Sequence, residues 1–378
     1  MIVRTPRPRD TVYIRTLPLV NGNYGGILQA YALQRVITDL GLRPVTDTSV
    51  PADWLKRTLR RPYYATVRRV TPTGVANVRL DRFVREHITT DRRIERAYSG
   101  APPRFDDVLA FVTGSDQIWR AQWAHIPSGF LSFADGYPAP RLSYAASFGV
   151  DTTDEYSQAD LEIARRMLPT FSAVSAREDS GVDLCSTIFG VPAQRHIDPT
   201  MLLPRDAYDA LIATVARGSA PARGRLLHYV LTPSEEATQL VDAVAAKTGL
   251  SPHAAMPTLS PERPGRWWNA KQFTRPSIEM WLANIRESAL VLTDSYHGTV
   301  FSILFNRPFL VFANPQRGQA RIRTLLATFG LEDRLIDLAA ASERPIPAEP
   351  AWQRIDDIRA QERARGLSYL AANLGTAP

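Results

Sequence analysis

Short apolar runs alternate with amphipathic segments along most of this chain, and that alternation restricts the fold to α/β classes built on parallel strands. Parallel neighbours need a long crossover connection, which is usually a helix. In the first half we predict a helix over Ile27–Leu40, which Gly41 ends. We predict strands in that half at Thr11–Leu17, Arg43–Thr46, Val108–Thr113, Leu142–Ser147 and Phe171–Ser175.

The second half repeats the alternation. We predict strands there at Leu226–Leu231, Ala289–Thr293 and Pro308–Phe312, and helices at Ser234–Lys247, His297–Phe305, Arg321–Phe329 and Trp352–Leu374. A chain of 378 residues exceeds what one hydrophobic core usually organises. We therefore expect two Rossmann-like domains facing across a cleft, formed by residues 1–203 and 204–349, with residues 350–378 packing back on the first.

The sequence predicts neither a membrane-spanning helix nor a disulfide within the chain. No stretch approaches the 18 consecutive apolar residues of a spanning helix, and the N-terminal segment lacks the apolar core of a signal peptide. The single cysteine, Cys185, suits a reducing compartment, and we interpret it as a small buried apolar residue. We expect a cytoplasmic protein.

The net charge of +7 is concentrated near the N-terminus. Residues 1–104 hold 19 Lys and Arg against 8 Asp and Glu, whereas the rest of the chain holds 26 against 30. Residues 54–96 combine 12 basic side chains with interleaved aromatic ones, a composition that suits the face of an anionic membrane or a diphosphate-lipid. A solvated, Arg-rich helix face is the alternative. No helix-turn-helix, zinc-finger or RNP motif is present, so we expect no nucleic-acid partner.

The sharpest local motif is Thr293–Thr299, where the apolar run LVLT passes through polar residues directly into a predicted helix. The first turn of a helix offers free N–H groups and a partial positive charge, which favour a phosphate or carboxylate. Asp294 or Ser295 can cap this helix, and Gly298 would let a ligand approach the backbone. A bound phosphate would stabilise the protonated form of His297. The alternative is a capped helix with an incidental histidine.

Three other polar stretches follow predicted strands, at the sheet edge where α/β proteins bind ligands. The glycine-rich Asn21–Gly26 matches neither the dinucleotide-binding nor the P-loop spacing, and a tight turn explains it equally well. Asp116 could take a proton from a hydroxyl. Arg177 could bind phosphate or carboxylate through its two-pronged guanidinium, or form a salt bridge with Glu178 or Asp179. No cluster has metal-ligand spacing, so we expect neither a metal nor a cofactor.

Six motifs in this order resemble the polysaccharide pyruvyl transferase family: NYGGILQAYALQ, GSDQIW, SYAASFG, SAREDSG, HIDPTMLL and VLTDSYHGTVFSILFNRPFLVF. The resemblance runs from about Asn21 to about Leu335. It implies a GT-B-like fold, phosphoenolpyruvate as donor substrate and a saccharide acceptor, often lipid-linked. In this family an arginine matching Arg177 and an Arg-Leu-His motif hold the donor. Here that motif reads Ser295, Tyr296 and His297, so one arginine is missing. Arg317 or Arg321 could replace its charge.

We therefore predict transfer of the enolpyruvyl group onto a sugar as a ketal, in polysaccharide or cell-wall glycan synthesis. His297 is the predicted acid and Asp116 the predicted base. The predicted donor-binding residues are Arg177, Ser295, Tyr296, His297, Gly298 and Thr299, and the predicted acceptor-binding residues are Asn23, Tyr24 and Trp267. The acceptor would enter from the first domain, and peripheral contact with the inner membrane face would fit a lipid-linked one. The alternatives are a glycosyltransferase with a nucleotide-sugar donor and a non-catalytic protein that binds glycans or a partner.

Overall fold

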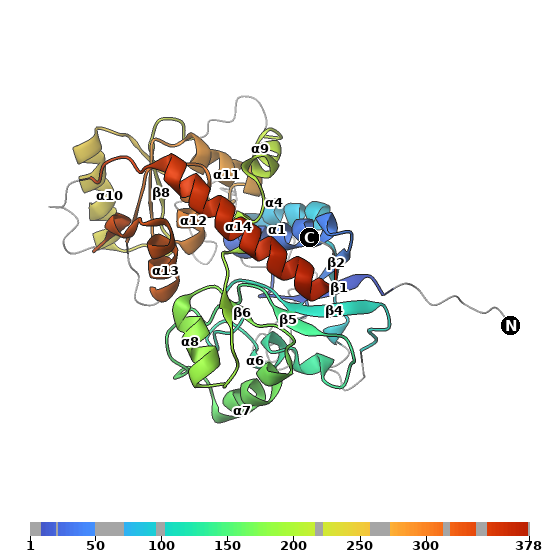
Figure 1. The fold of residues 1–378 in the computed structure, drawn as a ribbon. Helices are drawn as coiled ribbons and strands as arrows, with labels where there is room; N and C mark the ends of the chain where they lie inside the picture. The colour runs from blue at the N-terminus through green and yellow to red at the C-terminus, as the bar shows by residue number, and fades with distance from the viewer. Residues whose placement is uncertain are drawn as a thin grey trace.

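A computed structural model of the chain describes residues 9–19, 22–49, 72–95, 103–215, 222–257, 273–312, 318–337 and 346–376. Two five-stranded sheets organise these residues, one in each half of the chain, and every strand pairing in them is parallel (Figure 1). The predicted α/β class with two Rossmann-like sheets is therefore confirmed. The exact division into domains stays a prediction.

The first sheet has the strand order β3-β2-β1-β4-β5. Its strands are β1 (Thr11–Arg15), β2 (Arg43–Asp47), β3 (Thr90–Asp91), β4 (Val108–Thr113) and β5 (Arg141–Ser143). The central strands β1 and β4 are almost wholly buried, as expected for apolar strands covered on both faces. The helices of this half are α1 (Tyr24–Asp39), α4 (Pro72–His87), α6 (Ile126–Gly129), α7 (Gln158–Met167) and α8 (Asp179–Thr187).

Three predicted strands of this half are shorter in the structure than the apolar runs that suggested them, β1 by its last two residues and the other two by more. The run Leu142–Ser147 leaves the strand after Ser143, because Ala145 adopts a left-handed conformation with φ of 47°. Pairing then continues only through isolated bridges. The run Phe171–Ser175 contributes only its last residue to the short strand β6 (Ser175–Ala176), which pairs with β7 (Gln194–Arg195).

The second sheet has the order β12-β11-β10-β8-β9. Its strands are β8 (Leu226–Tyr229), β9 (Pro252–Ala254), β10 (Leu290–Thr293), β11 (Phe309–Phe312) and β12 (Leu335–Ile336). Its helices are α9 (Arg205–Ile212), α10 (Glu235–Thr248), α11 (Ile278–Glu287), α12 (Tyr296–Leu304) and α13 (Ala320–Phe329). Helix α12 is buried along its whole length, so other parts of the protein cover every side of it.

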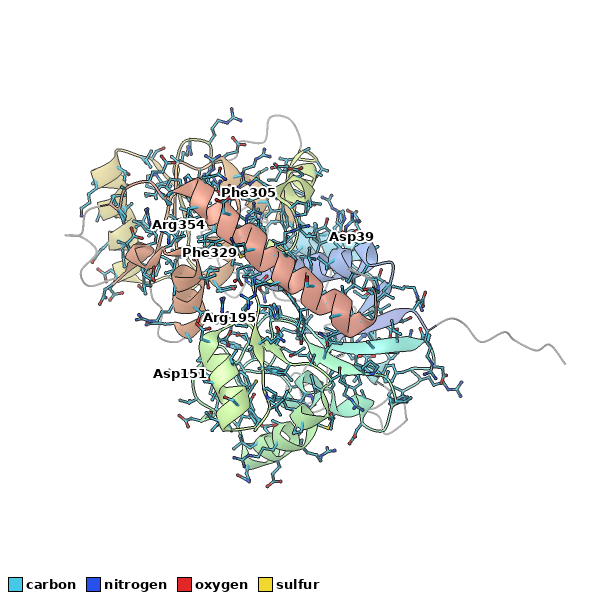
Figure 2. All side chains as sticks on the ribbon, viewed as in Figure 1. Asp39, Asp151, Arg195, Phe305, Phe329 and Arg354 are labelled. Atoms are coloured by element: carbon cyan, nitrogen blue, oxygen red, sulfur yellow. The ribbon has the colours of Figure 1, made fainter. Side chains whose placement is uncertain are left out.

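The last helix, α14 (Trp352–Leu374), extends from one half of the chain to the other, as expected (Figure 1). Near its start, Asp356 accepts hydrogen bonds from Arg205 of α9 and from Asn306. Near its end, Tyr369 donates to the backbone oxygen of Ser143 on β5, at 3.0 Å. Arg195, labelled in Figure 2, lies where α8, α13 and α14 meet and contacts a side chain of each.

Within the residues that the structure describes, no helix is both long and apolar enough to cross a membrane. Cys185 is buried, in agreement with the sequence interpretation, and burial raises the pKa of its thiol to about 12. The basic, aromatic part of the N-terminal region lies mostly in residues 50–71, outside the described residues.

Candidate active site

Helix α12 begins directly after the buried strand β10, and Ser295 caps it. The Ser295 Oγ accepts a hydrogen bond from the N–H of Gly298 at 3.2 Å, and the Ser295 backbone oxygen accepts one from Thr299. This cap places Tyr296 and His297 in the first helical turn, beside the first sheet's half of the molecule. Asp294 instead accepts hydrogen bonds from the N–H groups of Leu231 and Thr232.

A buried carboxylate, Asp198, organises the polar cluster opposite α12. Its Oδ2 accepts a hydrogen bond from Nη1 of Arg177 at 2.7 Å and one from the Ser115 hydroxyl at 3.2 Å. Its Oδ1 accepts from the N–H and the hydroxyl of Thr200, at 3.0 and 2.7 Å. Burial alone would raise the pKa of Asp198, but the nearby charges of His297 and Arg177 and the hydrogen bond from the N–H of Thr200 hold it well below the ordinary value. Asp198 is therefore ionised.

His297 reaches the same carboxylate from the second half of the chain. Its Nε2 lies 3.3 Å from Oδ2 of Asp198. The direction of this contact does not make a hydrogen bond, so Nε2 is a buried polar atom without a formed bond among the described residues. The other side of the ring lies against Gly25 of α1, where a side-chain Cβ would overlap the imidazole. Gly25 therefore makes room for His297.

Two buried guanidinium groups approach the ring of Tyr296. The Arg177 guanidinium carbon lies 4.3 Å from the ring centroid, and that of Arg321, on α13, lies 5.6 Å from it. Burial lowers the pKa of Arg321 to about 10, and the nearby charge of Arg177 contributes. Burial likewise raises the pKa of the Tyr296 hydroxyl above its ordinary value. At neutral pH two charged guanidinium groups and a neutral tyrosine ring therefore lie together here, close to the carboxylates of Asp198 and Asp116.

Asp116 lies beside this cluster in a left-handed conformation with φ of 70°, which is uncommon for a residue with a side chain. Its Oδ2 accepts a hydrogen bond at 2.9 Å from Nδ2 of Asn23, which also caps α1 through its Oδ1. The Oδ1 of Asp116 is 3.9 Å from Nη2 of Arg177, too far for a hydrogen bond. Within the described residues, both Nη2 and Nε of Arg177 are buried without a hydrogen-bond partner.

Unpaired buried donors are costly, and a ligand or water normally satisfies them. The residues Asp116, Arg177, Asp198, Tyr296, His297 and Arg321, hereafter the polar cluster, therefore form a buried polar site in which two nitrogens of Arg177 could still donate hydrogen bonds to a ligand or water. Among the described residues, no three His, Cys, Asp or Glu side chains form a group that could hold a metal ion.

The family model of the polysaccharide pyruvyl transferases matches residues 23–316. This chain belongs to that family. No functionally curated protein matches it in sequence.

Solved structures similar to this pyruvyl transferase family member are distant in sequence. UDP-GlcNAc 2-epimerase from Methanocaldococcus jannaschii is 10% identical, with a TM-score of 0.49 over 95% of this chain and 99% of that chain. A UDP-glucosyltransferase from Polygonum tinctorium capable of glucosylating indoxyl is 12% identical, with a TM-score of 0.48 over 99% of this chain and all of the other. These sequence identities and TM-scores are too low to support a conclusion about activity.

The structure brings together the residues predicted from three separate motifs of the pyruvyl transferase sequence. Arg177, His297 and Asp116 all belong to the polar cluster, and Asn23 is bonded to Asp116. The alternative interpretation was a salt bridge of Arg177 with Glu178 or Asp179. The structure shows neither salt bridge. The Glu178 carboxylate instead accepts hydrogen bonds from the Ser147 hydroxyl and from the N–H groups of Phe148 and Gly149.

Two expectations about α12 were wrong in detail. The N–H groups of Gly298 and Thr299 already donate to Ser295, so they are not free for an anion. Gly298 is needed for packing rather than for ligand approach, because a Cβ there would lie 2.6 Å from Oγ1 of Thr293 and 3.1 Å from Cδ1 of Tyr229. The predicted roles of Ser295, Tyr296 and His297 toward a donor stay predictions.

The structure does not bring Tyr24 into the polar cluster. Its ring is fully buried and stacks on Trp281, with centroids 5.2 Å apart, and its hydroxyl donates to the backbone oxygen of Pro276 at 2.7 Å. A ring enclosed in this way presents no face to a sugar. Trp267, the other aromatic acceptor candidate, and Arg317 lie outside the described residues.

Sequence reasoning missed Asp198, although its motif HIDPTMLL contributes to the family resemblance. One signal could have revealed it. Asp198 lies three residues after the end of β7, as Asp116 lies three residues after the end of β4, and Arg177 comes directly after β6. Polar residues at successive strand ends tend to meet at one edge of a parallel sheet.

Proposed function

We propose that this protein transfers the enolpyruvyl group of phosphoenolpyruvate to two hydroxyls of a saccharide, forming a pyruvate ketal and releasing phosphate. The supporting observation is the meeting of Arg177 and His297 on one buried carboxylate oxygen, with two guanidinium nitrogens left unbonded among the described residues. A donor with a phosphate at one end and a carboxylate at the other would satisfy such donors. Phosphate and carboxylate are the groups that a guanidinium binds through paired hydrogen bonds.

The donor would be held from both halves of the chain. Arg177 offers Nε and Nη2, and Arg321 offers a second cationic group near the Tyr296 ring. The family's arginine at position 295 is a serine here, and that serine caps α12. We assign its electrostatic role to Arg321, which lies on the neighbouring helix α13 and is buried in the same cluster.

His297 would donate a proton to the methylene carbon of the donor, which leaves an oxocarbenium at the adjacent carbon. One sugar hydroxyl attacks that carbon, and Asp116 takes the proton of this hydroxyl. The bond between the carbon and the phosphate oxygen then breaks, and phosphate leaves with the proton from Asp116. The second hydroxyl closes the ketal ring, and its proton returns to His297. The left-handed backbone at Asp116 and its bond from Asn23 fix that carboxylate for this role.

The saccharide would approach the edge that carries Asn23 and Asp116. A lipid-linked acceptor at the inner membrane face, in the cytoplasm, fits the basic N-terminal region and a role in polysaccharide or cell-wall glycan synthesis.

Phosphate release from phosphoenolpyruvate, measured with a saccharide extract as acceptor, tests this function. His297→Ala should lower the rate by at least about 10²-fold, the usual scale for a general acid. The exposed histidine of α4 supplies a matched control, and His87→Ala should leave the rate unchanged. No acceptor-dependent phosphate release by the wild-type protein would refute the proposal.

Thermal shift separates the rival activities, because a ligand that binds only the folded state raises the melting temperature. Phosphoenolpyruvate should stabilise the protein. Stabilisation by nucleotide-sugars alone would indicate a glycosyltransferase, and stabilisation by neither, with no phosphate release, a non-catalytic homologue.

A further inference from the structure

We infer that Gly318 is a positioning residue for Arg321. Because Gly318 has no side chain, the segment just before α13 can lie directly on the backbone of the first half, and this contact fixes the place of Arg321 in the polar cluster. The inference rests on the proposed function for the part that Arg321 plays toward the donor. The contact itself is a feature of the fold and needs no reaction.

Gly318 lies against the backbone of Gly149, which belongs to the other half of the chain. A Cβ at position 318 would stand 1.8 Å from the Gly149 backbone oxygen and 2.9 Å from its carbonyl carbon. Carbon atoms in contact normally stand about 3.5 to 4.0 Å apart, and a backbone cannot swing aside as a long side chain can. Gly318 also has a φ of 74°, in the left-handed region that favours glycine. Any side chain here would therefore push α13 and the first half apart.

Both sides of this contact continue into the polar cluster. In the first half, the N–H of Gly149 donates to the carboxylate of Glu178 at 3.0 Å, and Glu178 directly follows Arg177 in the chain. In the second half, Gly318 lies three residues before Arg321, whose buried side chain belongs to the first turn of α13. The charges of Arg177 and Glu178 both act on the Arg321 guanidinium, so these side chains lie close together. Displacing Gly318 would therefore move a cationic group of the site.

The later turns of α13 are fastened to the first half by hydrogen bonds. The Thr324 Oγ1 accepts from the N–H of Asp179 at 3.3 Å, and the Thr328 Oγ1 accepts from Nη1 of Arg195 at 2.9 Å. Figure 1 shows α13 beside α8, which begins at Asp179. These bonds resist a shift of the whole helix. The overlap created by a side chain at Gly318 should therefore displace mainly the first turn, which carries the guanidinium.

Calorimetric titration of the intact protein with phosphoenolpyruvate tests the inference. Gly318→Ala should lower the affinity about 10-fold or more, the scale for losing one hydrogen bond to a charged group. Arg321→Gln should lower the affinity by a similar factor, and combining the two substitutions should cause no further loss, because Gly318 acts through Arg321. An unchanged affinity in Gly318→Ala, or losses that multiply in the double variant, would overturn the inference.

Gly330 supplies the matched control, because it follows the other end of the same helix in a similar left-handed conformation, with φ of 65°. A Cβ there would lie 3.9 Å from Nη2 of Arg354, an ordinary contact, so Gly330→Ala adds backbone strain without overlap and should keep the affinity. Gly318→Asn is a second test variant, since asparagine adopts left-handed conformations more readily than alanine but still has a Cβ. Failure of both Gly318 variants to fold would assign this glycine to folding rather than to the site, and would contradict the inference as well.

A crystal structure of ligand-free Gly318→Ala separates this inference from the proposed function. Relieving the overlap requires a shift of about 1 Å or more, so the Arg321 guanidinium should move by that amount from its place beside the Tyr296 ring. A guanidinium that stays in place would refute the positioning role. If the wild-type protein does not bind phosphoenolpyruvate, the proposed function fails, and this structure still decides whether Gly318 positions Arg321.

Discussion

Replacing Gly25 with alanine tests whether the position of His297 depends on the first half of the chain. A Cβ at Gly25 would lie 2.5 Å from Cε1 of His297, and closer still to Nδ1 and Cγ. Carbon atoms in contact normally stand about 3.5 to 4.0 Å apart, so the ring must move by about 1 Å or more. A displacement of that size can cost about 10²-fold in rate. We therefore expect Gly25→Ala to lose at least that factor in phosphate release.

The free energy of unfolding of Gly25→Ala is a second test, because the substitution has a stabilising effect on the helix and a destabilising effect on packing. Alanine in a helix normally gains about 0.5 to 1 kcal/mol over glycine, whereas overpacking typically costs about 1 to 3 kcal/mol. We expect the loss to exceed the gain in the wild-type background. In His297→Ala the imidazole is absent, so the same substitution should be neutral or stabilising when measured by chemical denaturation.

Gly114→Ala is the matched control for this experiment, since a Cβ there meets Ile14 and Leu33 at ordinary contact distances of 3.4 and 3.5 Å. It should retain activity and stability. Equal destabilisation by Gly25→Ala with and without the imidazole, or full activity of the single variant, would refute the reasoning.

Three further predictions concern other parts of the structure. Arg177→Lys keeps the charge but loses the planar fork, so the affinity for phosphoenolpyruvate should fall about 10-fold or more by calorimetry, and an unchanged affinity would remove Arg177 from the donor site. Burial, aided by Arg365 and Arg195, lowers the pKa of His196 to about 4; a buried neutral histidine stabilises fully above about pH 6.5, and that stability is lost as the pH falls from about 6.5 to 4, on the order of 3 kcal/mol. Denaturation at pH 7 and pH 5 should show about 2 kcal/mol of this loss, and His196→Gln should reduce it. A Cβ in Gly366→Ala would overlap the Tyr144 hydroxyl, so this variant should lower the free energy of unfolding by about 1 to 3 kcal/mol in chemical denaturation. Adding Tyr144→Phe should restore part of that stability. No recovery in the double variant would show that α14 does not pack on Tyr144.

The elements that periodicity defines could be predicted from the sequence. The strand Val108–Thr113 and the helix Trp352–Leu374 match the structure residue for residue, because the strand is an apolar run that ends at Gly114 and the helix is a long polar segment that begins after a proline-rich stretch. The run Leu142–Ser147 was misjudged, since the left-handed backbone at Ala145 leaves no mark on an apolar pattern.

The sequence motifs predicted which residues would form the site, but not which of them would contact each other. Strand ends pointed to Asp116, Arg177 and His297, yet only the fold shows that Arg177 turns away from the adjacent Glu178 to Asp198. Likewise, Gly25 suggested a phosphate loop or a tight turn. Its actual neighbour is an imidazole 272 residues later in the chain, a relation that local spacing cannot encode.

The polar cluster is assembled from both halves of the chain, with Asp198 and Arg177 from one and His297 from the other. If the halves part to admit a sugar, His297 moves away from Arg177 and Asp198, and the polar cluster comes apart. In the proposed reaction the site would be incomplete while the halves are apart and complete only when they close, which would limit hydrolysis of phosphoenolpyruvate by water.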